Sequence, residues 1–156
     1  MAEARDLGLI AALYDALETE QTALRPTWRL ADGLPGPIAP SLADILLDED
    51  SVLVLGLLDE VPLGFAWGRS EPLLPQAGGR NIAVVRLIHT DIEARGVGIG
   101  AAMLEHVMRH FEHRGITLFD ARVSPGHRDA KNFFESHGFK ARLIVMNHDH
   151  EPSEKT

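Results

Sequence analysis

The chain has 156 residues, of which 45% are hydrophobic and 24% charged, and these proportions are typical of a globular protein of one domain. Its formal net charge of −8 argues against a general affinity for nucleic acid or anionic lipid. The lack of cysteine excludes a disulfide framework and a thiol nucleophile.

The N-terminal part is predicted to form two helices separated by a loop. Apolar residues recur at helical spacing over residues 6–20 and predict an amphipathic helix with Asp6 as its N-cap. Residues 24–40 hold four prolines and two glycines and predict an irregular loop. A second, short helix is expected over residues 41–47.

The middle of the chain predicts three strands. Residues 51–58 are apolar, residues 59–60 form a turn, and residues 61–70 return as the second strand of a hairpin. Residues 71–80 read as a loop. Residues 81–90 hold six apolar residues and predict a third strand of strongly buried character.

The second half alternates helices with strands. An apolar stripe from Ile99 to Phe111 predicts a helix that begins near Gly98 and ends at Gly115. A strand, a short helix and a last strand are expected over residues 116–123, 128–137 and 140–148. The alternation predicts an α/β (α+β) fold with a mixed sheet and about four helices.

This fold is expected to be one domain over residues 1–147, followed by a polar, disordered tail over residues 148–156. No apolar run reaches the length of a membrane span, and the first residues carry acids where a signal peptide carries bases. We therefore expect a cytoplasmic protein that binds neither membrane nor nucleic acid.

Three glycines alternate with apolar residues in the stretch EARGVGIGAAML, residues 93–104. They lie between the strand that ends at Thr90 and the helix that begins near Gly98. A helix N-terminus exposes backbone N–H groups and the positive end of the dipole, and glycine lets an anion approach them. The pattern predicts a phosphate or diphosphate site, with Arg95 adding a fixed charge.

Other known phosphate-binding motifs contain similarly spaced glycines. A P-loop needs lysine and then serine or threonine after the last glycine, where this chain has Ala101 and Ala102. Gly96, Gly98 and Ala101 match the dinucleotide fingerprint, but that motif begins a long doubly wound domain directly after its first strand. A further alternative is a glycine-rich turn that only packs a helix tightly against a sheet and binds no ligand.

The spacing Arg95-x-x-Gly98-x-Gly100 resembles the R/Q-x-x-G-x-G/A loop of the GCN5-related N-acetyltransferases (GNAT family). Some thirty residues later, HRDAKNFFESHGF (residues 127–139) is close to the family pattern N-x-x-A-x-x-F/Y-Y-x-x-x-G-F. The order of elements is also similar over nearly the whole chain, although the usual first strand is missing or reduced to residues 1–5.

The resemblance implies a GNAT-like acyl-CoA N-acyltransferase fold that binds acetyl-CoA where the sheet splays between the strands at 82–90 and 116–123. Main-chain groups of Ile88 and Thr90 would pair with the pantetheine arm, and the glycine-loop amides would hold the diphosphate. The expected acetyl-CoA contacts are Ile88, His89, Thr90, Arg95, Gly96, Val97, Gly98, Ile99, Gly100, Ala101, His127 and Phe134. No metal is expected.

The acid and the base of the reaction stay unassigned. Phe134 stands where many family members carry a tyrosine that protonates the leaving thiolate, and phenylalanine cannot donate a proton. Arg86 stands where some members carry a glutamate base, and arginine is no base at neutral pH. His89 and Asp120 are the remaining candidates, with Asp91 as a further one.

Four residues are candidate contacts of the acceptor: Trp28, Arg29, Glu71 and Arg86. Trp28 has an equal alternative role as an anchor of the loop, and Arg86 as a solvated surface residue. The expected function is acetyl transfer from acetyl-CoA to a primary amine by direct attack. A CoA-binding module without activity is the alternative, and a homodimer is expected.

Overall fold

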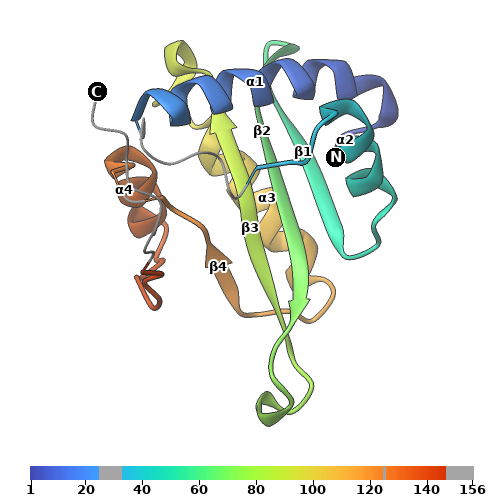
Figure 1. Ribbon diagram of the computed structural model, residues 1–156, viewed down its shortest axis with the longest axis vertical. Coiled ribbons are helices and arrows are strands. Elements are labelled where there is room, and N and C mark those ends of the chain that lie inside the picture. The colour runs from blue at the N-terminus through green and yellow to red at the C-terminus, as the bar shows by residue number, and fades with distance from the viewer. Residues whose placement is uncertain (25–32, 125, 147–156) are drawn as a thin grey trace, which may run out of the picture.

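The computed structural model describes residues 1–24, 33–124 and 126–146. Within these residues it has four α-helices and one four-stranded sheet (Figure 1). The elements in chain order are α1 (Leu7–Leu24), α2 (Ile38–Leu47), β1 (Ser51–Leu58), β2 (Val61–Pro72), β3 (Asn81–Thr90), α3 (Ile99–Glu112), β4 (Phe119–Ala121) and α4 (Arg128–Ser136). The predicted α/β class with a mixed sheet is confirmed.

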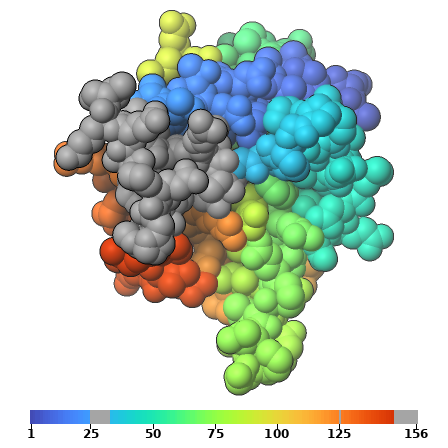
Figure 2. Space-filling model, in the orientation of Figure 1, coloured from blue at the N-terminus to red at the C-terminus, as the bar shows by residue number. Residues whose placement is uncertain are grey.

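The strands lie in the order β1-β2-β3-β4. The first two pairs are antiparallel, and β3 pairs with β4 in parallel. A parallel pair needs a crossover connection, and α3 provides it. The tip of the β2–β3 hairpin contains the short helix η2 (Pro75–Ala77) and projects from the body of the molecule (Figure 2).

Helices cover both faces of the sheet. One buried cluster joins α1 and α2 to one face, and a second joins α3 and α4 to the other. Figure 1 shows α1 crossing the end of β3, with α3 behind the sheet and α4 beside β4. The end of β3 thus lies where helices from both layers come together.

Glycines on β1 and β2 allow α3 to pack closely on the sheet. A Cβ atom at Gly68 would lie 2.6 Å from Val107 Cγ1 and 2.9 Å from Phe111 Cε2, both in the core. A Cβ atom at Gly56 would lie 2.7 Å from Met103 Sδ. This role of the glycines cannot be predicted from the sequence, because it depends on which strand residues face a helix that is distant in the chain.

We expect Gly68→Ala to lower the free energy of unfolding by about 1–3 kcal/mol, because the added methyl group overpacks a core without free space. Gly8→Ala is the matched control, since a Cβ atom at Gly8 meets nothing within 4 Å and alanine is the better helix former. Urea unfolding monitored by circular dichroism measures both changes. Equal stability of the two variants would contradict the packing role of Gly68.

The prediction of a last strand over residues 140–148 is wrong for residues 140–146, the part that the structure describes. Residues 140–146 form no strand, and residues 147–148, like the predicted tail, lie outside the described residues. The neighbouring strand β4 has only three residues and offers few main-chain groups for pairing. Side chains attach the segment instead, because Arg142 forms a two-point ion pair with Asp120.

The other differences concern the ends of elements. Helix α2 begins at Ile38 and not at Ser41, because a proline in the first turn, here Pro40, loses no helical hydrogen bond. Asp6 is not the N-cap of α1: its carboxylate accepts from Glu3 N at 2.8 Å and caps the short helix η1 (Ala4–Asp6). Among the described residues, no helix combines the length and apolarity of a membrane span.

Candidate acetyl-CoA site

The sheet opens beside the second half of β3. The β3–β4 ladder consists of Ala83↔Phe119, Val84↔Asp120 and Val85↔Ala121. A last bond runs from Arg122 N to Val85 O at 3.3 Å. Beyond this point β3 continues to Thr90 still paired with β2, but in the described part of the chain no strand lies along its other edge. This gap is the splay predicted between the two strands.

A β-bulge lies where the gap begins. Trp67 of β2 pairs with Leu87, whereas its neighbour Gly68 pairs with Val85. Arg86 is therefore an extra residue in β3. After an extra residue, the main-chain groups of a strand point toward the opposite edge from the one expected by regular alternation, here toward β2 in place of β4 or the reverse.

Two hydrogen bonds show this reversal. Ala83 N donates at 2.9 Å to a carbonyl just before β4, whereas Asp91 N donates at 2.7 Å to a carbonyl of β2. Because main-chain groups alternate between the two edges of a strand, Ile88 and Thr90 present theirs to the gap. These are the two residues predicted to pair with a pantetheine arm.

Helix α3 begins at the end of the gap. Its N-cap is Gly98, at a φ of 93° and without a capping side chain. The first helical bond runs from Ala102 N to Gly98 O at 3.0 Å. In an α-helix the preceding N–H groups have no partner inside the helix, so those of Ile99, Gly100 and Ala101 are available to an anion.

The three glycines have different roles. Gly96 and Gly98 have positive φ angles of 85° and 93°, and a Cβ atom at either would meet nothing within 4 Å. A Cβ atom at Gly100 would lie 3.3 Å from Phe133 Cε2 and 3.4 Å from Thr90 Oγ1. Gly100 therefore packs α3 closely against α4 and β3, while the other two leave open space beside the N–H groups. Val97 lies exposed between them.

Arg95 is held at this loop by two contacts. Its Nε donates to Thr90 O at 3.1 Å, and its Nη2 donates to Glu20 Oε2 on α1 at 2.6 Å. The bond from Arg95 lowers the pKa of Glu20 below its usual value, so the carboxylate is ionised at neutral pH. Sequence reasoning missed Glu20, because nothing distinguishes it from the other glutamates on the polar face of α1.

His89 lies next to the same carboxylate. Its Nδ1 is 3.8 Å from Glu20 Oε2, and its ring packs against Phe65 with centroids 6.3 Å apart. The side chain is only 5% exposed. Burial lowers the pKa of His89 below its usual value, with a smaller lowering by Arg95, so the imidazole is neutral at neutral pH.

His127 provides a test of whether the site fits acetyl-CoA. It is the N-cap residue of α4, and its Nε2 atom is buried with no hydrogen-bond partner among the described residues. A buried polar atom is rarely left without a partner. The orphaned atom, the open space at Gly96 and Gly98, and the free amides of α3 fit a polar ligand that carries phosphate.

Among the described residues, no aromatic hydroxyl is free to act as a proton donor at this site. Phe134 is 4% exposed and packs in the core with Phe133 and Phe139 at centroid distances of 5.2 and 5.3 Å. Tyr14, the only tyrosine, is fully buried, accepts from Leu34 N at 2.7 Å, and has its pKa raised by burial to about 12.

The remaining candidates are held in ion pairs. Arg86 donates to Glu71 Oε1 at 2.6 Å and lies over the Trp67 ring, so each of the two charges neutralises the other. Asp120 is paired with Arg142, whose guanidinium donates to both oxygens of the carboxylate. Asp120 is therefore engaged directly by a cation, whereas His89 lies next to the carboxylate of Glu20.

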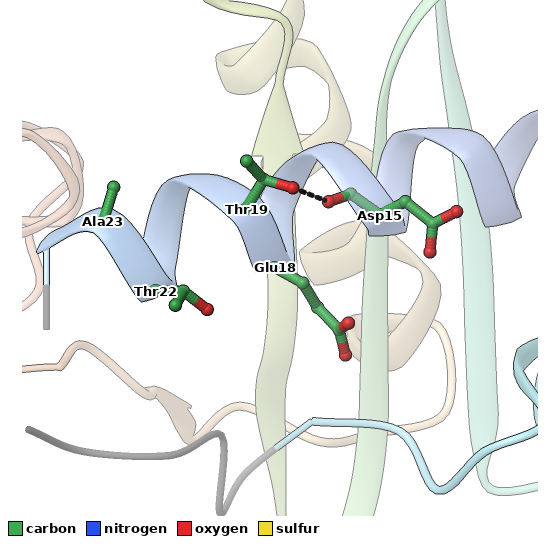
Figure 3. Close-up of a pocket in the computed structure, with 5 residues that line it drawn as sticks. All are labelled: Asp15, Glu18, Thr19, Thr22 and Ala23. Atoms are coloured by element: carbon green, nitrogen blue, oxygen red, sulfur yellow. Dashed lines mark hydrogen bonds between the residues drawn. The ribbon is translucent and has the colours of Figure 1, made fainter. Parts of the chain in front are cut away.

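Other parts of the molecule add little to the site. Trp28 and Arg29 lie outside the described residues. An open hollow is lined by Asp15, Glu18, Thr19, Thr22 and Ala23, all from α1, and contains none of the predicted site residues (Figure 3). In the described ranges no three His, Cys, Asp or Glu residues come together as metal ligands.

A sequence comparison decides the family. The sequence model of the acetyltransferase (GNAT) family matches residues 10–139, which include the open sheet edge, the glycine loop and α4. The chain belongs to the GNAT acetyltransferase family. The resemblance carried by the two motifs is thus confirmed, and the family's general activity is acetyl transfer.

Solved structures of other proteins have a similar fold. A mutant of the BH1408 protein from Bacillus halodurans has a TM-score of 0.81 and 19% identity over 95% of this chain and 96% of that one. A ribosomal-protein-alanine N-acetyltransferase from Brucella melitensis reaches 0.69 and 17% over 95% and 96%. A predicted acetyltransferase from Clostridium acetobutylicum, solved with acetyl-CoA, reaches 0.69 and 14% over 95% and 92%. No curated protein sequence matches this GNAT chain.

Proposed function

We propose that this GNAT protein transfers the acetyl group of acetyl-CoA to a primary amine of a small molecule or peptide by direct attack. The observation that carries the proposal is the open edge of β3, which leads directly to the uncapped N-terminus of α3. One surface thus offers strand-like pairing to a pantetheine arm and free N–H groups to a diphosphate.

The roles of the chain's own residues follow from this placement. Ile88 and Thr90 hold the pantetheine arm through their main chain, and the Ile88 N–H polarises the thioester carbonyl. The amides from Gly96 to Ala101 hold the diphosphate. His127 supplies a polar contact through its orphaned Nε2 atom. Phe134 supports α4 from the core behind this surface.

A CoA-binding module without transferase activity is the second candidate. It is favoured by the lack of a hydroxyl at Phe133 and Phe134 and by the engagement of Arg86 with Glu71. A CoA thiolate is a good leaving group, so the missing proton donor does not by itself prevent transfer. We therefore keep the enzyme as the first proposal.

Thiol release from acetyl-CoA in the presence of a panel of primary amines tests the choice. The chain has no cysteine and contributes no background to a thiol reagent. We expect release that depends on the amine and saturates with it, with acetylated amine confirmed by mass spectrometry. Tight CoA binding without release for any amine would favour the binding module.

We also propose a homodimer, supported by the exposed apolar segment Leu143–Met146, whose four side chains are all more than 70% exposed. Sedimentation velocity that shows only a monomer at micromolar concentration would contradict it. The cytoplasmic location stays a prediction from the sequence.

A further inference from the structure

Three elements place charged and titratable groups around Glu20 at the end of β3. Arg95 lies 2.6 Å from its carboxylate, and His89 lies 3.8 Å from the same oxygen atom. His127, on α4, is close enough to influence the charge of Glu20. The carboxylate of Glu20 is about one third exposed, whereas the His89 ring is almost fully buried.

The two imidazole nitrogens of His89 have different surroundings in this arrangement. Nδ1 is the nitrogen near the carboxylate, so an N–H at Nδ1 is the tautomer that the negative charge favours. Nε2 then carries the lone pair. A carboxylate that favours the N–H at one ring nitrogen of a histidine leaves the other nitrogen able to accept a proton.

His89 also has the right position along the strand. It lies between Ile88 and Thr90, which present their main-chain groups to the gap, and its side chain projects on the face covered by α1. The base of a direct attack must lie near the thioester but outside the cosubstrate itself. Of the other base candidates from the sequence, Asp120 is engaged by Arg142, and Asp91 Oδ1 accepts from Glu93 N at 2.9 Å.

We propose that His89 is the base that takes a proton from the acceptor ammonium, and that Glu20 is the positioning residue that orients it. This inference rests on the proposed function. It assigns a role to Glu20, and it implies that the natural acceptor is an amine basic enough to arrive protonated.

The proton and electron balance is complete within the proposed reaction. Nε2 of His89 accepts one proton from the ammonium, directly or through one water, and the freed lone pair forms the new C–N bond. The C–S bond then breaks with its electron pair on sulfur. The thiolate takes the second proton from nitrogen, and the proton on His89 returns to solvent. The products are the amide and the CoA thiol.

The charged groups that face His89 set the direction of its pH dependence. Burial and Arg95 lower its pKa below the ordinary value of 6.5, while Glu20 and Asp91 raise it. The wild-type kcat/KM should therefore decline on the acid side only below pH 6.5. Removing the charge of Glu20 removes an influence that raises this pKa, so the acid limb should move to lower pH in Glu20→Gln.

Thiol release with a strongly basic alkylamine and with a weakly basic amine, neutral at the assay pH, tests the assignment. We expect His89→Gln to lower kcat/KM for the alkylamine by about 10²–10⁴-fold, with little loss for the weakly basic amine, which needs no base. Glu20→Gln should lose about tenfold or more with the alkylamine, with the acid limb moved as stated. The double variant should be no worse than His89→Gln alone, since the two residues act as a unit.

Glu105→Gln is the matched control, because it also removes the carboxylate of a Glu–Arg pair, here the exposed pair with Arg109 on α3. It should leave kcat/KM unchanged. Equal losses of His89→Gln with both amines, or additive losses in the double variant, would overturn the proposal. If His89→Gln fails to fold, an unmoved acid limb in Glu20→Gln overturns it. Absence of turnover in the wild type would instead contradict the proposed function.

Discussion

Replacing Gly98 by valine should lower the affinity for CoA by about 10²–10⁴-fold. The variant loses two charge-assisted hydrogen bonds to the diphosphate, each of about 1.5–3 kcal/mol, and about 1.4 kcal/mol corresponds to a tenfold change in affinity. Gly98 is the N-cap of α3, and a side chain there would enter the open space beside the free amides. Within the described part of the chain nothing lies within 4 Å of the added Cβ atom, so the loss falls on the ligand.

Backbone strain must be separated from this loss. Valine at a φ of 93° is strained, and a non-glycine residue in such a conformation costs about 1–3 kcal/mol. Gly79, in the projecting hairpin tip, has a φ of 72° and the same open surroundings. Gly79→Val therefore carries comparable strain far from α3 and should bind CoA like the wild type in isothermal titration calorimetry. Equal affinity of both variants would contradict the role of Gly98.

Phe134→Ala should destabilise the fold by about 3–5 kcal/mol, as is usual when a buried phenylalanine is truncated. The ring joins α4 to the buried face of α3 and contacts both Phe133 and Phe139. Phe134 was expected to contact acetyl-CoA because it stands at a motif position of the GNAT family. Its burial shows that most of its contact surface is inside the protein.

Chemical unfolding in the presence and absence of CoA separates the two roles. Phe133→Ala is the comparison, because Phe133 is only partly buried and its ring reaches Gly100 at the start of α3. We expect the larger loss of stability in Phe134→Ala. A variant Phe134→Ala that is as stable as the wild type but binds CoA weakly would show that the ring serves mainly as a wall of the site.

The sequence predicted most elements because their signals are local. The apolar stripe of α3 and the glycine that follows it predicted the start of this helix to within one residue and its end to within three, since both signals depend on spacing along one segment. The last strand was mispredicted for the opposite reason. Apolar residues near Leu143 have strand character, but a strand also needs a partner, and β4 is too short to supply one.

The candidate site could be proposed from the sequence where it depends on the main chain. Glycines and an arginine at fixed spacing indicate an anion site at a helix N-terminus whatever the surrounding residues are. The contacts of Arg95 were not predictable, because Glu20 is far away in sequence and reaches the loop only once α1 crosses β3. The pairing of Glu71 with Arg86 also depends on strand register, which the bulge in β3 shifts by one residue.

The most direct test of the account is an amide NMR titration of the isotopically labelled protein with CoA and, separately, with pantetheine, which lacks the diphosphate. We expect CoA to shift the amide signals of Ile99, Gly100 and Ala101 strongly, and pantetheine to leave these three nearly unmoved while it shifts those of Ile88 and Thr90. If CoA leaves the signals of Ile99, Gly100 and Ala101 unmoved at saturation, or if its main shifts fall on the outer surface of α1, the diphosphate does not bind at the N-terminus of α3.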